Sequence, residues 1–261
     1  MYFIKKKMKF PKTPSFRLKG KRSLITGAGR GIGLGAAIAL SEAGSEVVII
    51  SRTEKELKCL NDFLEDQGYK SKYKILDITK ICDVENFIGN ERPFDILVNN
   101  AGINIPSSFV DTNIKDYEKV MELNVNALIN LTKLVVKKML KNKIRGSIIN
   151  VSSQMGHVGA IKRTTYCASK FAVEGFTKAL SIELAEKKIR VNSICPTFIE
   201  TSLTKEFLKN KKFKDYVLSM IPLKRLGKIE DIMGAFVFLA SDASSLMTGT
   251  SLVLDGGWTA R

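Results

Sequence analysis

Residues 26–33 read Thr-Gly-Ala-Gly-Arg-Gly-Ile-Gly, and this stretch decides the fold. It follows a short apolar run at residues 23–26 and precedes an apolar-periodic stretch that ends before Gly44. Glycines let the backbone turn tightly and let a pyrophosphate approach the N-terminus of the next helix, where N–H groups and the dipole favour an anion. A plain tight turn would not need four glycines in seven residues. The stretch therefore predicts a dinucleotide-binding turn with contacts from Gly27, Arg30, Gly31, Ile32 and Gly33.

Outward from this turn, apolar runs alternate with longer amphipathic stretches. We expect further strands at residues 46–51, 73–76, 96–99, 147–152, 190–194 and 251–254, and helices at 54–67, 81–89, 116–140, 165–186 and 229–241. The strands are apolar without alternation, as in sheets buried on both faces. The pattern predicts the α/β class: one domain with a doubly wound parallel sheet of about seven strands. Residues 1–20 are basic, contain Pro11 and Pro14, and are interpreted as an N-terminal extension of a domain at 21–261.

Composition narrows the class of protein. Of the 261 residues, 44% are hydrophobic and 26% are charged, which is typical of a soluble globular protein. The apolar runs are far too short for a membrane helix, so no membrane partner is expected. At the N-terminus the apolar residues precede the lysines, the reverse of a signal peptide, and we therefore expect a cytoplasmic location.

Cysteine and histidine usage argues against metal and disulfide frameworks. Cys59, Cys82, Cys167 and Cys195 are scattered without metal-ligand spacing, and His157 is the one histidine. We expect four reduced thiols and no metal.

The net charge of +16 raises the question of nucleic acid. Arginine, which reads bases and clamps phosphates, supplies only 10 of the 42 basic side chains, and the lysines are spread along the chain. This distribution favours a general lysine bias, so no nucleic-acid partner is expected.

The end of the second strand predicts the cofactor. An acid there would bind the free 2′-hydroxyl of NAD, whereas a basic residue suits the 2′-phosphate of NADP. Residues 49–53 read Ile-Ile-Ser-Arg-Thr, in which Ser51 can hydrogen-bond a phosphate and Arg52 can pair with it. The sequence therefore favours NADP(H) over NAD(H), with Arg30 as a weaker contributor.

A tyrosine and a lysine stand four residues apart on the predicted helix at 165–186. Tyr166 and Lys170 thus share one face, and Ser153 follows the strand before it. A Lys⁺ beside a tyrosine lowers the phenol pKa, and a tyrosine tuned in this way can supply the proton that an alkoxide needs during hydride transfer. The pair alone is common by chance.

Several motifs together resemble the short-chain dehydrogenase/reductase family. They are residues 26–33, Asn99-Asn-Ala-Gly102, Asn124, Ser153, Tyr166-Cys-Ala-Ser-Lys170, Pro196-Thr-Phe-Ile-Glu-Thr201 and the ending Gly249-Thr-Ser-Leu-Val-Leu-Asp-Gly-Gly257. The resemblance spans residues 16–261. It implies a Rossmann fold, a nicotinamide cofactor, an oxidoreductase that acts on CH–OH groups, and a homotetramer.

The resemblance also implies roles for individual residues. Tyr166 would be the acid/base, Lys170 would bind the nicotinamide ribose and tune the tyrosine, and Ser153 would bind the substrate oxygen. Asn124 would hold a water in the proton relay. The implied cofactor contacts are Asp77 and Ile78 beside the adenine, Asn99, Ala101 and Gly102, and Pro196, Ile199 and Thr201 near the carboxamide. Thr197 departs from the family, which usually has glycine there.

Two substrate classes stay open. One is a 3-oxoacyl thioester on an acidic carrier protein, which we favour; the alternative is a polyol, sugar or sugar acid such as gluconate. A non-catalytic NADP-binding protein is a further alternative, but it would not need Ser153, Tyr166 and Lys170 together. Residues 202–225 are the expected substrate lid, and they are rich in lysine. A cationic lid, with Lys162 and Arg163 in the facing loop, suits an anionic carbonyl substrate, small or carrier-bound.

Overall fold

Seven parallel strands form one sheet in the order β3-β2-β1-β4-β5-β6-β7. The computed structural model describes residues 10–201, 204–205 and 208–260. The strands are β1 (Arg22–Thr26), β2 (Glu46–Ser51), β3 (Ser71–Ile75), β4 (Ile96–Asn99), β5 (Ser147–Val151), β6 (Arg190–Pro196) and β7 (Ser251–Leu254). The predicted single α/β domain with a parallel seven-stranded sheet is thereby confirmed.

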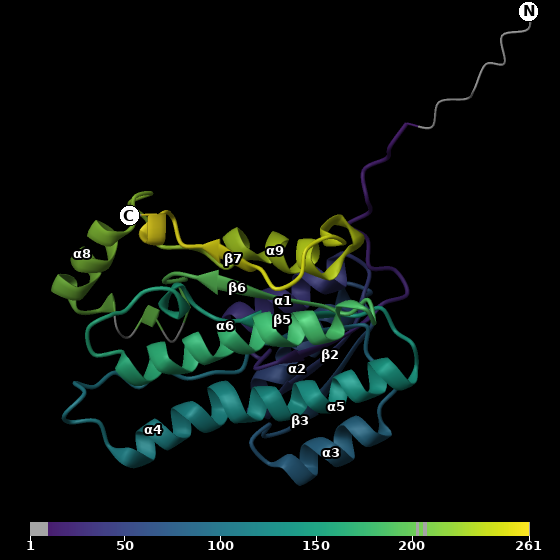
Figure 1. Cartoon of the computed structure of the whole chain (residues 1–261), viewed down its shortest axis with the longest axis horizontal. Helices are drawn as coiled ribbons and strands as arrows, with labels where there is room; N and C mark the ends of the chain where they lie inside the picture. Colours follow the sequence, from purple (N-terminus) through teal and green to yellow (C-terminus); the bar gives the residue numbers. More distant parts are fainter. Residues whose placement is uncertain (1–9, 202–203, 206–207, 261) are drawn as a thin grey trace, which may run out of the picture.

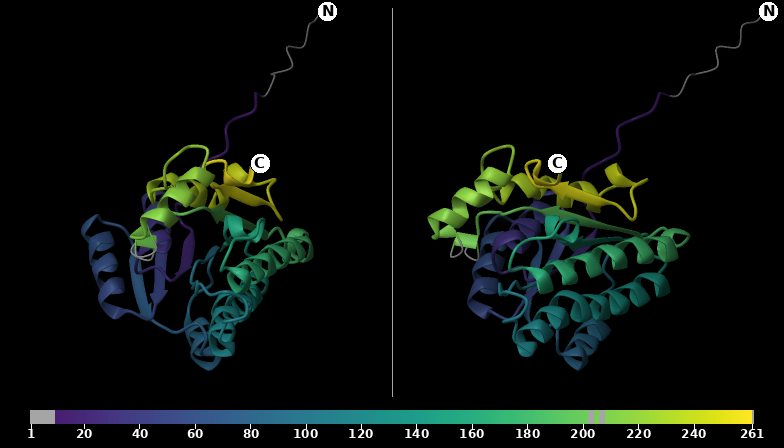
Figure 2. Two further views of the ribbon diagram at one scale, coloured as in Figure 1. Left: turned by 90° about the vertical axis from the view of Figure 1, so that its left-hand side faces the viewer. Right: turned by 60° about the vertical axis from the view of Figure 1, so that its left-hand side comes forward.

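Helices cover both faces of the sheet (Figure 2). The helices α1 (Gly31–Glu42), α2 (Glu54–Asp66) and α9 (Glu230–Ala240) pack on one face, and α3 (Ile81–Asn90), α5 (Leu128–Lys141) and α6 (Thr164–Ala185) on the other. Leu24 and Ile25 are neighbours in β1, and because side chains alternate along a strand they enter different cores. Burial on both faces explains the uninterrupted apolar strands. None of the helices in the described ranges is both long and apolar enough to cross a membrane.

The strand order reverses between β1 and β4. From β1 the chain adds β2 and β3 on one side of that strand, and it then adds β4 on the other side of β1. In open α/β sheets such a switch point opens a crevice at the carboxyl ends of the strands. Figure 1 shows β6 and β7 pointing toward this end, where α8 (Lys211–Met220) lies.

The long helix expected at residues 116–140 is interrupted. It consists of α4 (Ile114–Met121), a π-helical turn η1 (Glu122–Ala127) and α5. A π turn lies between stretches that are both helical, so the sequence pattern predicts one continuous helix across it. Such turns are frequent at functional sites, and this one carries Asn124.

The domain begins before residue 21. Leu18 is buried, with 1% of its surface exposed, and its N–H donates to the carbonyl of Ala43 at 2.7 Å. The boundary drawn at residue 20 is therefore wrong by a few residues, since one apolar side chain in a basic stretch is not a periodic signal. Residues 1–9 of the predicted extension lie outside the described residues.

The segment expected as the lid contains a helix that the sequence reading missed. Asn210 caps α8 by accepting from the N–H of Phe213 at 3.0 Å, and Val217 is buried beneath it. The helix has only a narrow apolar face, and three lysines in its first turn make the sequence look like a polar loop. Residues 202, 203, 206 and 207 of this segment, including Glu206, lie outside the described residues.

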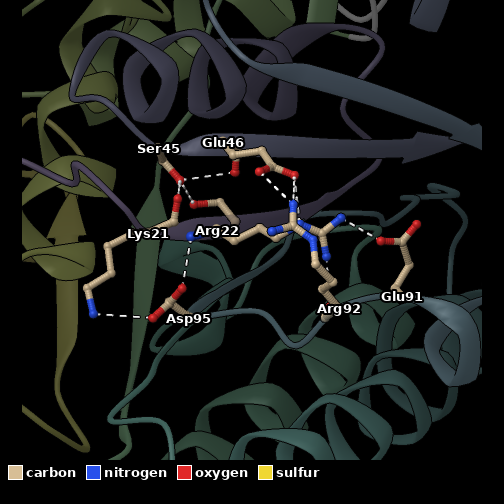
Figure 3. Close-up of polar contacts among 8 residues, drawn as sticks. Lys21, Arg22, Ser45, Glu46, Glu91, Arg92 and Asp95 are labelled. Atoms are coloured by element: carbon tan, nitrogen blue, oxygen red, sulfur yellow. Dashed lines mark hydrogen bonds and ion pairs between the residues drawn. The ribbon is translucent and has the colours of Figure 1, made fainter.

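A cluster of charged side chains closes the amino-terminal edge of the sheet, opposite the crevice (Figure 3). Arg22 is 5% exposed; its Nε donates to Glu46 at 2.9 Å, another nitrogen pairs with Glu91, and the third donates to the carbonyl of Arg92 at 2.7 Å. Every guanidinium nitrogen is therefore satisfied, as a buried charge requires.

Candidate active site

A cavity of about 510 Å³ opens at the carboxyl ends of the strands, at the switch point. Most of the predicted site residues line it: Gly27, Arg30, Gly31, Ile32, Ser51, Arg52, Asp77, Ile78, Ala101, Gly102, Ser153, Tyr166, Lys170, Pro196, Ile199 and Thr201. Gly33, Asn99 and Asn124 do not.

The glycine turn forms the floor of the cavity. Gly27 and Gly31 have φ of +61° and +57°, which disfavours any side chain, and a Cβ on Gly27 would lie 2.9 Å from the Cα of Ala101. No side chain among the described residues caps the N-terminus of α1. Unpaired N–H groups at a helix end that faces a cavity fit a pyrophosphate. Gly33 lies beneath the floor, in direct contact with the carbonyl of Gly27.

The two adjacent asparagines at the end of β4 have different surroundings. Asn99 is buried, and its Nδ2 donates to Thr132 at 2.8 Å and Asn150 at 2.9 Å, so its side chain links β4 to β5 and α5. Asn100, which the sequence reading did not select, lines the cavity and donates to the carbonyls of Thr26 and Gly27. It therefore fixes the glycine turn.

Charges at the β2 end of the cavity are paired. Arg52 lies 3.9 Å from Asp77, and Arg30 lies 3.4 Å from Glu56, an acid that the sequence reading did not select. Burial raises the pKa of Asp77, but hydrogen bonds from Thr79 and the charge of Arg52 outweigh it and hold that pKa below its usual value. Both arginines are about two-thirds exposed, so they can turn toward a phosphate.

Three side chains meet at the other end of the cavity. Tyr166 and Lys170 extend from the first turns of α6, and Ser153 lies two residues past β5. Ser153 hydrogen-bonds to the Tyr166 hydroxyl, and its Oγ also accepts from the N–H of Met155 at 3.1 Å. Lys170 is 5% exposed and donates from Nζ to the carbonyl of Val151 at 2.8 Å.

The expected lowering of the tyrosine pKa is wrong for the cofactor-free protein. Burial raises the pKa of Tyr166 to about 12, and the hydrogen bond from Ser153 offsets only part of this effect. Burial also lowers the pKa of Lys170 to about 8. For both groups, the loss of solvent around the charged form is the largest cause of the pKa shift.

The side chain of Asn124 is fully engaged. Its Oδ1 accepts from the N–H of Ile103 at 2.8 Å, while its Nδ2 donates to the carbonyl of Ile103 at 2.9 Å and to Ser169 at 3.1 Å. The amide therefore ties the π turn to the segment after β4 and to α6. Any water held by this residue would bind its main chain, where the π turn breaks the regular ladder.

Arg163 lies in the wall of the cavity beside Tyr166. It precedes α6, is 7% exposed, donates to the carbonyl of Lys162 at 3.1 Å, and stands 6.0 Å from the ring centre of Phe213 on α8. Burial lowers its pKa. The cavity thus carries a weakly hydrated cation close to the tyrosine hydroxyl.

Two residues, Arg225 in the expected lid and Thr197 just after β6, have surroundings that the sequence does not reveal. Arg225 is engaged by Asp231 through contacts of 2.6 and 2.9 Å, so its charge is neutralised. Thr197 lines the cavity, and its N–H donates to the carbonyl of Leu254 at 3.2 Å. Its φ is not among the positive values, so the backbone there does not require glycine.

Comparisons with known proteins agree with this geometry. Residues 27–259 match a family model described as Enoyl-(Acyl carrier protein) reductase. The chain is 40% identical to the 2-dehydro-3-deoxy-D-gluconate 5-dehydrogenase of Bacillus subtilis, over 95% of this chain and 98% of that protein. It is 38% identical to a 3-oxoacyl-(acyl-carrier-protein) reductase of Rickettsia felis, over 92% and 97%. A solved gluconate 5-dehydrogenase from Burkholderia cenocepacia, in complex with NADP and tartrate, superposes with a TM-score of 0.90 at 33% identity, over 94% and 98%.

Proposed function

The chain belongs to the short-chain dehydrogenase/reductase family, and from this premise we propose an NADP(H)-dependent interconversion of a carbonyl and a secondary alcohol in the cavity. Oxidoreductase activity on CH–OH groups is common to the named relatives. The cofactor preference, the residue roles and the substrate class are our proposals.

The cofactor fits the cavity from end to end. The glycine turn and the N-terminus of α1 would hold the pyrophosphate, Ser51 and Arg52 the ribose phosphate, and Lys170 the other ribose. Bound in this way, the nicotinamide would supply or accept the hydride.

The proton is handled by the chain itself. Tyr166 donates its hydroxyl proton to the oxygen that becomes the alcohol, and Ser153, which is already hydrogen-bonded to that hydroxyl, binds the same oxygen. A pKa of about 12 keeps Tyr166 protonated until the reaction begins. The ammonium of Lys170 then stabilises the phenolate while it forms.

Arg163 is the observation that carries the substrate class. A guanidinium that is 7% exposed and lies inside the cavity suits a carboxylate on the substrate itself, because burial strengthens a charge-assisted hydrogen bond. This favours a sugar acid, the alternative from the sequence. The relative from Burkholderia cenocepacia was solved with tartrate, a small dicarboxylate, and NADP.

A 3-oxoacyl thioester on a carrier protein is the second candidate. The observation in its favour lies outside the cavity lining: Lys211, Lys212 and Lys214 stand in the first turn of α8, whose Phe213 lies 6.0 Å from Arg163 in the cavity wall. An acidic carrier would dock on this outer surface and extend only its neutral acyl chain inward.

A substrate panel tests both candidates. We expect kcat/KM for a hexonate with NADP⁺ to exceed that for the uncharged hexitol and that for an acetoacetyl carrier thioester with NADPH. Arg163→Gln should lower the hexonate value at least tenfold and spare the hexitol, since a hydrogen bond to a charged group contributes about 1.5–3 kcal/mol. A preference for the thioester, insensitive to Arg163→Gln, would establish the second candidate instead.

A further inference from the structure

Three side chains far apart in the sequence converge behind the active site. His157 follows the short 3₁₀ turn η2 (Gln154–Gly156), Glu174 lies on α6 one turn after Lys170, and Cys195 lies in β6. The Cys195 Sγ is 3.4 Å from His157 Nε2 and 3.3 Å from Glu174 Oε1, and His157 Nε2 is 3.7 Å from Glu174 Oε2.

We propose that His157, Glu174 and Cys195 form a binding site for Zn²⁺ or a similar borderline transition-metal ion. Imidazole nitrogen, thiolate sulfur and carboxylate oxygen are the three ligand types that zinc takes in proteins. Ligands of a tetrahedral zinc ion at the usual bond lengths lie roughly 3.3–3.6 Å apart. The two separations from the thiol sulfur fall in that range, whereas the third, 3.7 Å, joins the imidazole to the other carboxylate oxygen, Oε2. With one ligand atom from each residue, the three atoms lie within 4.8 Å of one another, so an ion could bind after a small rotation of the carboxylate.

The chemistry of the cluster also selects the ion. A sulfur ligand and an imidazole discriminate against Mg²⁺ and Ca²⁺, which prefer oxygen. The thiol of Cys195 donates to Glu174, and the incoming ion would replace this proton, which passes to solvent. One thiolate, one carboxylate and a neutral imidazole would then balance the two charges of the ion.

The surroundings hold the ligands in place. Ser193 donates to Glu174 Oε2 at 3.0 Å, and Ser251 donates to the same oxygen. With two serine hydroxyls directed at one of its oxygens, the Glu174 carboxylate is held in place, and only 5% of the residue is exposed. Hydrogen bonds of this kind orient the carboxylate ligands of metal sites.

A glycine makes the approach of His157 possible. A Cβ on Gly156 would lie 3.0 Å from the Cγ of Glu174 and 3.2 Å from the carbonyl of Lys170, so only glycine lets the turn lie flat on α6. Glu174 and Cys195 are buried, whereas the side chain of His157 is 30% exposed. The imidazole thus offers the ion an entry path and leaves room for a fourth ligand, water.

Cobalt binding to the full chain without a histidine tag tests the site. Co²⁺ takes zinc sites and reports its ligands through a near-ultraviolet charge-transfer band from thiolate and through intense visible bands when tetrahedral. After treatment with a chelator, the protein should bind one Co²⁺ with both signatures, and Zn²⁺ should abolish them. Cofactor binding, followed by NADPH fluorescence, verifies that each sample is folded.

Variants separate the proposed site from adventitious binding. His157→Asn changes the exposed ligand and should weaken Co²⁺ binding at least tenfold, while Cys195→Ser should remove the charge-transfer band. Cys167→Ser is the matched control, since this half-buried thiol lies on α6 outside the cluster, and it should leave the spectrum unchanged. Co²⁺ binding without a thiolate band, a band lost in Cys167→Ser but kept in Cys195→Ser, or no binding at all would overturn the proposal and leave a hydrogen-bonded cluster.

Discussion

The Nζ of Lys170 lies 5.6 Å from the ring centre of Tyr166, one helical turn away on α6. The lysine donates to the carbonyl of Val151 rather than to the phenol oxygen, which leaves donors of the ammonium for a ligand. Its influence on the tyrosine is therefore through the electric field. Such a field matters most when the phenol acquires negative charge, because an opposite charge nearby stabilises the ionised form.

Removal of the Tyr166 hydroxyl should stop turnover without loss of cofactor binding. In Tyr166→Phe the ring still fills its place, but the proton donor is gone, and acid/base groups contribute about 10²–10⁴-fold. We expect kcat to fall by at least two orders of magnitude and the NADPH dissociation constant to change less than about threefold. Tyr117→Phe, at an exposed tyrosine of α4, is the control. Near-native turnover in Tyr166→Phe would refute the proton role.

The buried charge of Lys170 should leave a mark on stability against pH. Its pKa is about 8 in the folded protein and 10.5 when unfolded, so between these values the unfolded chain binds the extra proton and folding stability rises with pH. Lys170→Met lacks this contribution. The difference in free energy of unfolding, wild type minus variant, should therefore grow from pH 8 to pH 10.5, by on the order of 3 kcal/mol. Chemical unfolding of both cofactor-free proteins measures it, and a flat difference would contradict the burial argument.

The sequence was sufficient for the sheet because glycine spacing and doubly buried strands are local signals. It was not sufficient where one extra residue or a distant contact decides the outcome. The π turn at Asn124 lies between two helical stretches that read as one helix, and the place of Leu18 depends on a carbonyl at Ala43. Neither feature is visible in a window of neighbouring residues.

The site residues also divide into those with a local sequence signal and those whose role depends on distant contacts. Tyr166 and Ser153 could be selected because they stand in motifs that resemble those of the family, and both line the cavity. Asn99 and Asn100 are adjacent asparagines. Only the structure shows that Asn100 lines the cavity and that Asn99 is buried and bonded to Asn150 of β5. The pKa of Tyr166 was expected to fall, but desolvation depends on how many atoms surround the hydroxyl, which spacing does not reveal.

Reversal of the Arg52 charge should move the cofactor preference. Arg52 is exposed, lies 3.9 Å from Asp77, and is the basic residue that follows β2. We expect wild-type protein to bind NADPH more tightly than NADH by about 1.5–3 kcal/mol, the contribution of a charge-assisted hydrogen bond. Arg52→Asp should remove this preference, whereas Arg92→Asp, at the far edge of the sheet, should not. Titration of both cofactors by fluorescence decides, and tighter NADH binding by the wild type would rule out the assignment.

Loss of the Arg22 guanidinium should destabilise the fold while sparing the site. Arg22→Met leaves Glu91 and the carbonyl of Arg92 without their buried partner. Breaking a fully buried pair costs about 3–5 kcal/mol, and the cost here should be smaller because the side chain of Glu91 is 27% exposed. We expect a clear fall in melting temperature. Arg145→Met removes an equal charge from an exposed position and should change stability by less than about 0.5 kcal/mol. Equal melting temperatures for the two variants would show that the cluster of Figure 3 is dispensable.

The lysines of α8 should accelerate encounter with anionic substrates. Lys211, Lys212 and Lys214 lie in the first turn of α8, the helix whose Phe213 is 6.0 Å from Arg163 in the cavity wall. Their field extends about one Debye length, roughly 30 Å at 0.01 M salt and 8 Å at 0.15 M. We expect kcat/KM for a hexonate to fall steeply across this range and kcat/KM for the uncharged hexitol to stay flat.

Replacement of the three lysines by glutamine should flatten the hexonate response. The same replacement at Lys137, Lys141 and Lys187, which removes equal charge from exposed positions toward the opposite edge, should not. Because steering acts before the substrate enters, Arg163→Gln should lower hexonate turnover yet keep the salt slope. If the wild type, the α8 variant, the control variant and Arg163→Gln all show the same salt slope for the hexonate, the charge of α8 is incidental. Recognition of the anion then occurs inside the cavity alone.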